Sequence, residues 1–365
     1  MKKRVCFNIY DVNAKGGEER MCTTLANVLA ENGYSVYICS FFSHSNLLSF
    51  FPICAKVEVK HLLGSFMERR VHQFFPFLKY AEHKYKSYLK QNHIDVIIDV
   101  DTDRTPFTAP IAKKLGIKHI AWDHFYYGRF KKRACSKIVY QHLLHDVDKL
   151  VVLTKDDEYL YKNDAKLPCE KVVQIYNSSP IQENEKYQHN SHVVLAMGRF
   201  TYQKGYDMLL EAWHLIAKDF PDWTLKIVGD GEDKQILQDN INAMGLKNVV
   251  LAPATKNPKE EYLNADFFVL SSRYEGLGLV LLEAANMSLP LVSFDCDNGP
   301  REIIQEGVNG FLVKANDTQQ LAESIQRLIV DSDLRQRMSD NALETVSKFR
   351  TECIALQWMR MIDSL

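Results

Sequence analysis

The chain has 365 residues, of which 46% are hydrophobic and 25% are charged, and its formal net charge at pH 7 is −1. This length is about twice that of a typical domain, and the composition is that of a globular protein, so we expect two domains. No apolar run reaches the roughly 18 residues that span a bilayer, and the N-terminal segment lacks the apolar core of a signal peptide. Eight scattered cysteines without a C-x-x-C pair point to a reducing compartment, so we expect a cytoplasmic protein.

The two halves of the chain differ in charge. Residues 1–180 carry 27 Lys and Arg against 19 Asp and Glu, whereas residues 181–365 carry 18 against 27. The basic first half is therefore expected to face an anionic partner, either membrane lipid or a phosphate-bearing molecule. The near-neutral total charge and the lack of a recognisable nucleic-acid-binding module argue against nucleic acid.

The first half reads as alternating strands and helices. A strand at 4–10, a loop with Gly16 and Gly17, a helix at 18–32 and a strand at 35–40 form a βαβ opening. Further strands are expected at 57–61, 96–100, 119–122 and 150–153. The pattern predicts a mainly parallel sheet covered on both faces, in a Rossmann-like domain over residues 1–178.

A polar segment at 177–190 reads as a linker, and a second α/β series follows it. Its strands are expected at 192–197, 224–228, 248–251, 267–270, 291–294 and 310–313. This series predicts a second Rossmann-like domain over residues 190–346. Because ligands of such sheets bind beyond the carboxyl ends of the strands, the loops there are expected to carry the chemistry.

The strongest motif is RYEGLGLVLLE at 273–283, a glycine-rich loop followed by a helix. Gly276 and Gly278 let backbone N–H groups approach a diphosphate at the helix N-terminus, where unpaired donors and the helix dipole favour negative charge. Glu283 lies about one turn inside the helix, where its carboxylate can accept hydrogen bonds from a ribose diol; Glu275 precedes the turn. Alternatively, both are surface acids near a helix start.

A second motif, GRFTYQKG at 198–205, follows the first strand of the second half and precedes a helix expected at 206–218. Arg199 offers a planar fork of donors and Lys204 a compact charge, the two kinds of cation that hold phosphate oxygens without a metal. Solvated surface cations are the alternative interpretation of either residue alone.

These two motifs, in this order and spacing, resemble those of glycosyltransferase family 4, retaining enzymes of the GT-B fold. The resemblance covers nearly the whole chain and includes GGEER at 16–20, VVLTK at 151–155, GPREII at 299–304 and GVNGFLV at 307–313. It implies an α/β protein of the GT-B class, with two Rossmann-like domains facing a central cleft. It also implies that a last helix, at about 347–365, packs back on the first domain.

The resemblance further implies a nucleotide diphosphate sugar as donor, with roles for individual residues. Arg199 and Lys204 would bind the diphosphate, Glu283 the ribose and Glu275 the hydroxyls of the transferred sugar. The remaining phosphate-binding positions would be Gly16, Gly17, Gly276, Leu277, Gly278 and Leu279. The family also has a histidine close to the sugar, for which His124 is the candidate and the adjacent Asp123 the rival. His124, Glu275, Arg199 and Lys204 would thus be the catalytic residues.

In such retaining enzymes the acceptor attacks from the face that the diphosphate leaves, so neither a protein nucleophile nor a metal cofactor is expected. The resemblance of residues 295–302 to members that use UDP-sugars favours a UDP-linked hexose or N-acetylhexosamine, with GDP-mannose as the alternative. A lipid-linked or polysaccharide acceptor is expected. A sugar-nucleotide epimerase of the same fold and a non-catalytic nucleotide-sugar-binding subunit are the rival interpretations.

Two tempting metal motifs are discounted. Asp99, Asp101 and Asp103 form a D-x-D-x-D run that would suit a divalent ion or a phosphatase, but that interpretation leaves the phosphate motifs of the second half without a role. We expect the run to be a loop at the cleft edge that contacts acceptor hydroxyls. His142 and His145 lie three apart on a helix but lack a third zinc ligand.

Basic and aromatic residues alternate over residues 60–92, and residues 129–137 add five cations. Such a surface docks on anionic lipid, so peripheral contact with the inner face of the membrane is expected. The alternative is that the aromatic residues belong to the core. The cations are Lys60, Arg69, Arg70, Lys79, Lys84, Lys86, Lys90, Arg129, Lys131, Lys132, Arg133 and Lys137, and the aromatics are Phe66, Phe74, Phe75, Phe77, Tyr80, Tyr85 and Tyr88.

Overall fold

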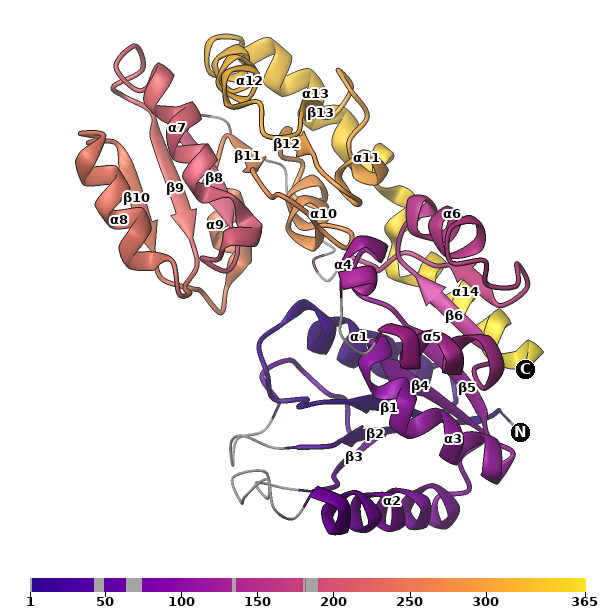
Figure 1. Cartoon of the computed structure of the whole chain (residues 1–365). Helices are drawn as coiled ribbons and strands as arrows, with labels where there is room; N and C mark the ends of the chain where they lie inside the picture. The colour runs from indigo at the N-terminus through magenta and orange to yellow at the C-terminus, as the bar shows by residue number, and fades with distance from the viewer. Residues whose placement is uncertain (1, 43–48, 64–73, 133–135, 180, 182–189) are drawn as a thin grey trace. The chain divides into compact units, whose positions relative to one another are not determined.

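The computed structural model describes residues 2–42, 49–63, 74–132, 136–179, 181 and 190–365. The chain divides into two compact units: unit 1 comprises Met1–Pro180 and Thr351–Leu365, and unit 2 comprises Ile181–Arg350. Both are built from parallel strands with helices packed against them (Figure 1). The polar segment at 177–190 contains the boundary, but most of it lies outside the described residues.

In the described part of unit 1, seven parallel strands form one sheet in the order β3-β2-β1-β4-β5-β6-β7. The strands are β1 (Arg4–Ile9), β2 (Ser35–Ser40), β3 (Val57–His61), β4 (Val96–Val100), β5 (Lys118–Trp122), β6 (Lys149–Val152) and β7 (Val172–Gln174). The helices are α1 (Gly17–Glu31), α2 (Phe74–Gln91), α3 (Thr105–Leu115), α4 (Tyr127–Lys132), α5 (Ser136–His145), α6 (Lys155–Asn163) and α14 (Thr351–Ser364), with a 3-10 turn, η3, at Thr102–Arg104. β4 is buried along its whole length, as is typical of a central parallel strand covered on both faces.

In the described part of unit 2, six parallel strands form a sheet in the order β10-β9-β8-β11-β12-β13. They are β8 (Val193–Met197), β9 (Thr224–Val228), β10 (Val249–Ala252), β11 (Phe267–Leu270), β12 (Leu291–Asp295) and β13 (Gly310–Lys314). The helices are α7 (Tyr206–Ile216), α8 (Lys234–Ala243), α9 (Pro258–Leu263), α10 (Leu279–Asn286), α11 (Pro300–Ile303), α12 (Thr318–Val330) and α13 (Ser332–Thr345), with 3-10 turns η4 (Tyr202–Lys204) and η5 (Ser347–Phe349). The core lies between this sheet and helices such as α7 and α12.

Both sheets have the strand order of the Rossmann fold, so the predicted α/β class with two Rossmann-like domains is confirmed. In this order the chain reverses its direction of travel across the sheet at one point, which is called the switch point. The switch point lies between β1 and β4 in unit 1, and between β8 and β11 in unit 2. Ligands of such sheets bind at the switch point, beyond the carboxyl ends of the strands.

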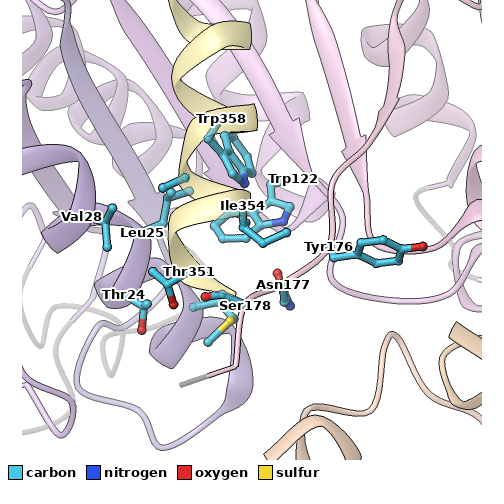
Figure 2. A pocket seen from close by; sticks show the side chains of 12 residues that line it. Thr24, Leu25, Val28, Trp122, Tyr176, Asn177, Ser178, Thr351, Ile354 and Trp358 are labelled. Atoms are coloured by element: carbon cyan, nitrogen blue, oxygen red, sulfur yellow. The ribbon is translucent and has the colours of Figure 1, made fainter. Parts of the chain in front are cut away.

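The helix α14, yellow in Figure 1, comes last in the chain but belongs to unit 1, where it packs against α1. Trp358 of α14 is fully buried, and its ring lies 4.8 Å from that of Trp122 at the end of β5. Figure 2 shows the small cavity beside these rings, lined by α1, α14 and the segment from Tyr176 to Ser178. Burial of two indole rings makes α14 an integral part of the core of unit 1.

Candidate functional site

The two motifs predicted to form a donor site follow the two strands at the switch point of unit 2. Gly198–Gly205 follows β8, and the loop from Ser271 to Gly278 follows β11, which pairs with β8. The loops are in direct contact, because the Nζ atom of Lys204 lies 2.6 Å from the Oε1 atom of Glu275. The sheet topology therefore brings together residues that are 71 positions apart in the sequence.

The pair of Lys204 and Glu275 is largely shielded from water. The side chains are 16% and 8% exposed, and the hydroxyl of Ser272 donates a second hydrogen bond to Glu275 at 2.6 Å. A carboxylate at this depth needs such partners, since an uncompensated buried charge is costly. Arg199, by contrast, is exposed. The interpretation of these groups as ordinary surface charges therefore fails for Lys204 and Glu275.

Glu283 is likewise not a surface acid. It lies in α10, is only 3% exposed, and accepts a hydrogen bond of 2.8 Å from the hydroxyl of Tyr262, which is fully buried in α9. A hydrogen bond from a phenol to an ionised carboxylate is stronger than one between neutral groups. Tyr262 therefore fixes one oxygen of Glu283 beside the first turn of α10.

Glycines allow the two loops of unit 2 to approach each other closely. Gly205 has a φ of +62°, and a Cβ atom there would lie 2.2 Å from the carbonyl oxygen of Ser271. Gly278, at the start of α10, has a φ of +84°. Both positions favour glycine on conformational grounds. In the second loop Gly276 is half-buried and Leu277 is buried, and Leu279, directly after Gly278, begins the helix.

The switch point of unit 1 carries the other predicted residues. Gly16 precedes α1, where its N–H donates to the carboxylate of Glu19 at 2.9 Å, and Gly17 is the first residue of the helix. After β4, Asp101 is buried with a φ of +83° and a ψ of +140°, a backbone conformation that residues other than glycine rarely adopt. Burial, and then the nearby carboxylate of Asp101, raises the pKa of Glu18 to about 8.

His124 lies just beyond β5, at the same edge of the sheet. The N–H of Asp101 donates to the carbonyl of Trp122 at 2.9 Å, so the loops after β4 and β5 are neighbours. The ring of His124 is 4.3 Å from that of Trp122, is 8% exposed, and its Nε2 atom has no hydrogen-bond partner among the described residues. Burial lowers its pKa to about 3 despite the opposing effect of Asp101, so the ring is neutral at physiological pH.

Asp123, the rival of His124 for the position close to the sugar, is buried and hydrogen-bonded within unit 1. It is 1% exposed and accepts hydrogen bonds from the hydroxyl of Tyr161 at 2.6 Å and from the N–H of Phe125 at 3.2 Å. These bonds hold the loop that carries His124.

The prediction that Asp99 belongs to a loop at the cleft edge is wrong. Asp99 lies within β4, is fully buried, and accepts hydrogen bonds from Asn8 at 2.8 Å and from Thr108. The ring of His119 lies 2.8 Å away, and its charge and hydrogen bond lower the pKa of Asp99 although burial raises it. This carboxylate is therefore a hydrogen-bonded part of the core of unit 1. Among the three acids only Asp101 and Asp103 lie beyond the strand, and Asp103 is exposed.

The basic aromatic surface is smaller than predicted. Tyr85 and Tyr88 point into the core of unit 1, so for these two the alternative interpretation is correct. Lys79, Tyr80 and Lys84 form an exposed face of α2, together with Lys90. Phe66, Arg69, Arg70 and Arg133 lie outside the described residues, as do the side chains of Phe74, Phe75 and Lys132. Among the described helices none is long and apolar enough to cross a membrane.

Several residues of the site were not identified from the sequence. Tyr262 and Ser272 hold the two glutamates, and Arg273 forms an ion pair with Asp207 at 2.6 Å. Nothing in the sequence indicated that Tyr262 contacts Glu283, since it lies 21 positions before Glu283 in a short helix. Arg273 stands inside the predicted motif, but its partner is 66 positions away, so the sequence did not reveal their pairing.

Comparisons with known proteins agree with this geometry. Residues 15–182 match the family model described as Glycosyltransferase Family 4, and residues 177–345 match the one described as Glycosyl transferases group 1. The chain is 28% identical to the amylovoran biosynthesis glycosyltransferase AmsD of Erwinia amylovora, over 96% of this chain and 97% of that one. It is also 28% identical, over 98% of both chains, to an alpha-1,4-N-acetyl-D-galactosaminyltransferase of Campylobacter jejuni that acts on an undecaprenol-linked glycan.

A solved structure shares the fold. The crystal structure of Anabaena HepE in complex with UDP and glucose superposes with a TM-score of 0.80 over the full length of both chains, at 18% identity. The predicted GT-B class is thereby confirmed. The two glycosyltransferase models and the glycosyltransferase relatives confirm the prediction of an enzyme. The chain belongs to the glycosyltransferases, with a family 4 domain in its first half and a group 1 domain in its second.

Proposed function

We propose that this glycosyltransferase transfers a hexose or N-acetylhexosamine from a UDP-sugar to a lipid-linked or polysaccharide acceptor, with retention of configuration and without a metal ion. The observation that carries the proposal is the contact of Lys204 with Glu275 at the switch point of unit 2. A lysine held there provides a cation for the leaving diphosphate, and the glutamate accepts hydrogen bonds from sugar hydroxyls. When the donor binds, its phosphate replaces Glu275 as the partner of Lys204.

Further residues complete the proposed donor site. Arg199, exposed after β8, adds a second cation for the diphosphate, and Glu283, held by the hydroxyl of Tyr262, receives the ribose diol. Backbone amides from Gly276 to Leu279, at the start of α10, and that of Gly17, at the start of α1, would bind phosphate oxygens at helix N-termini. As the glycosidic bond breaks, charge grows on the β-phosphate, and the two cations stabilise it.

We assign the acceptor side to unit 1. Neutral His124, whose Nε2 atom has no hydrogen-bond partner within the described part of the chain, would contact the transferred sugar. The buried carboxylate of Asp101 would accept a hydrogen bond from the acceptor hydroxyl. The undecaprenol-linked substrate in the name of the Campylobacter relative supports a lipid-linked acceptor. That name also specifies an α-linkage, which is the linkage that retention would give from an α-linked donor. The exposed cations of α2 would then rest on the inner face of the membrane from the cytoplasmic side.

The test is a calorimetric titration of UDP, GDP and ADP, without divalent metal, into the wild type and Glu283→Ala. UDP is expected to bind to the wild type, and the variant is expected to lose that binding. Glu323→Ala, which changes an exposed glutamate of α12, is the matched control and should bind as the wild type does. Silence of the wild type with all three nucleotides, or binding only after Mn²⁺ is added, would refute the metal-free donor site.

A further inference from the structure

Arg273 joins the two donor-site loops of unit 2 through its side chain. Its guanidinium donates to both carboxylate oxygens of Asp207, at 2.9 and 2.6 Å, and to the carbonyl oxygen of Tyr202 at 2.8 Å. It also lies over the ring of Tyr202, with its central carbon 4.0 Å from the ring centroid. A bidentate ion pair combined with stacking gives a fixed geometry that lysine cannot reproduce.

The backbones of the loops are joined at the same place. The N–H of Arg273 donates to the carbonyl of Gln203 at 2.8 Å, and the side chain of Gln203 donates to the carbonyl of Tyr274 at 3.0 Å. The hydroxyl of Ser271 donates to the carbonyl of Lys204 at 2.9 Å. These bonds run along η4, the single 3-10 turn that carries Lys204.

The guanidinium of Arg273 is committed to these contacts. It is 17% exposed, and its forked face is bound to Asp207. The hydrogen bonds and charge of Arg273 lower the pKa of Asp207 although burial raises it, which keeps this partner ionised. The ammonium of Lys204 contacts Glu275, but it stands at the end of a flexible four-carbon chain on a one-turn segment. Its position depends on how firmly that segment is held.

We propose that Arg273 is a positioning residue for the donor diphosphate: it touches no substrate itself, but fixes η4 so that the Nζ atom of Lys204 stays at the phosphate site. This inference rests on the function proposed above and adds a residue to it. Preorganised charges need no rearrangement when the substrate arrives, so a loose η4 costs affinity for phosphate rather than for the nucleoside.

The experiment is a calorimetric comparison of UDP and uridine binding in Arg273→Ala, Lys204→Ala and the double variant. Arg273→Ala is expected to weaken UDP binding about tenfold, the scale of one hydrogen bond to a charged group, and to leave uridine binding unchanged. In the Lys204→Ala background the same change is expected to have no further effect, because Arg273 acts through Lys204. Arg273→Lys, which keeps the charge but loses the fork, is expected to lie between the wild type and Arg273→Ala.

Lys226→Ala is the control, since it breaks another ion pair of unit 2, that of Lys226 with Glu261, and should bind UDP normally. The inference is overturned if Arg273→Ala binds UDP as the wild type does, if uridine and UDP weaken equally, or if the effects of Arg273 and Lys204 add. Should Arg273→Ala fail to fold, unchanged UDP binding by Arg273→Lys overturns the inference equally. Wild-type silence toward every nucleotide would instead overturn the proposed function, and this inference with it.

Discussion

Replacing Tyr262 by phenylalanine removes one hydroxyl and, with it, the 2.8 Å hydrogen bond to Glu283. Both side chains are buried, so water does not readily take the place of the lost donor. A hydrogen bond to a charged group contributes about 1.5 to 3 kcal/mol, and we expect a loss of about 2 kcal/mol in the free energy of unfolding of unit 2. For a unit of this size, that corresponds to a drop of about 4 to 8 °C in the melting temperature.

The same substitution tests the role of Glu283. Without the phenol, the carboxylate is no longer fixed for the ribose, so UDP affinity is expected to fall about tenfold, whereas affinity for pyrophosphate, which has no ribose, is expected to stay unchanged. Calorimetric titration with both ligands and thermal unfolding provide the two measurements. Tyr206→Phe is the matched control for stability, because the buried hydroxyl of Tyr206 has no hydrogen-bond partner among the described residues. A Tyr262→Phe variant as stable as the wild type, or one that loses UDP and pyrophosphate equally, would refute the reasoning.

Two further predictions concern the switch point of unit 1. Asp101→Gly should stabilise the chain by about 1 kcal/mol in chemical unfolding. Glycine adopts this backbone conformation without the strain of about 1 to 3 kcal/mol that aspartate bears, but part of that gain is offset by the greater conformational entropy that glycine loses on folding. A loss of stability would contradict the strain argument. In the folded chain the pKa of Glu18 is raised to about 8, whereas the unfolded chain releases this proton above about pH 4.5. The stability of the wild type therefore falls as the pH rises from about 4.5 to about 8. Glu18→Gln should therefore melt at a higher temperature than the wild type at pH 8.5 and at about the same temperature at pH 4. A difference in melting temperature between variant and wild type that is the same at both pH values would exclude the effect.

The strands were predictable from the sequence because their burial leaves a direct mark on it. β4 reads VIIDV, with one acid, and β11 reads FFVL; both are mostly apolar runs bounded by polar turns, and the structure has strands at both places. β7 was missed since three residues, VVQ, are too short to stand out. Local sequence alone placed Asp99 in a loop, because an acid near a strand end is usually exposed to solvent. Its partners Asn8 and His119 lie on neighbouring strands and are distant in the sequence.

Site chemistry was predictable to the level of motifs and not of contacts. The glycines, the cations and the two glutamates could be recognised by residue type and spacing. Only the pairing of β8 with β11 brings Lys204 to Glu275 and Arg273 to Asp207. In α2, residue spacing gave no means of separating the exposed Tyr80 from the buried Tyr85, because a helix with aromatic residues on several sides leaves its core-facing side undefined.

The return of α14 to unit 1 has a consequence for synthesis of the chain. The ribosome makes the strands of unit 1 first, but Trp358 reaches Trp122 only after all of unit 2 has been translated. At about 5 to 20 residues per second, the intervening segment takes roughly 10 to 30 s to emerge. Throughout that interval the side of α1 that α14 later covers remains open to water and to other nascent chains. The half of the molecule that is translated first is thus completed last, and unit 2 has time to fold before it.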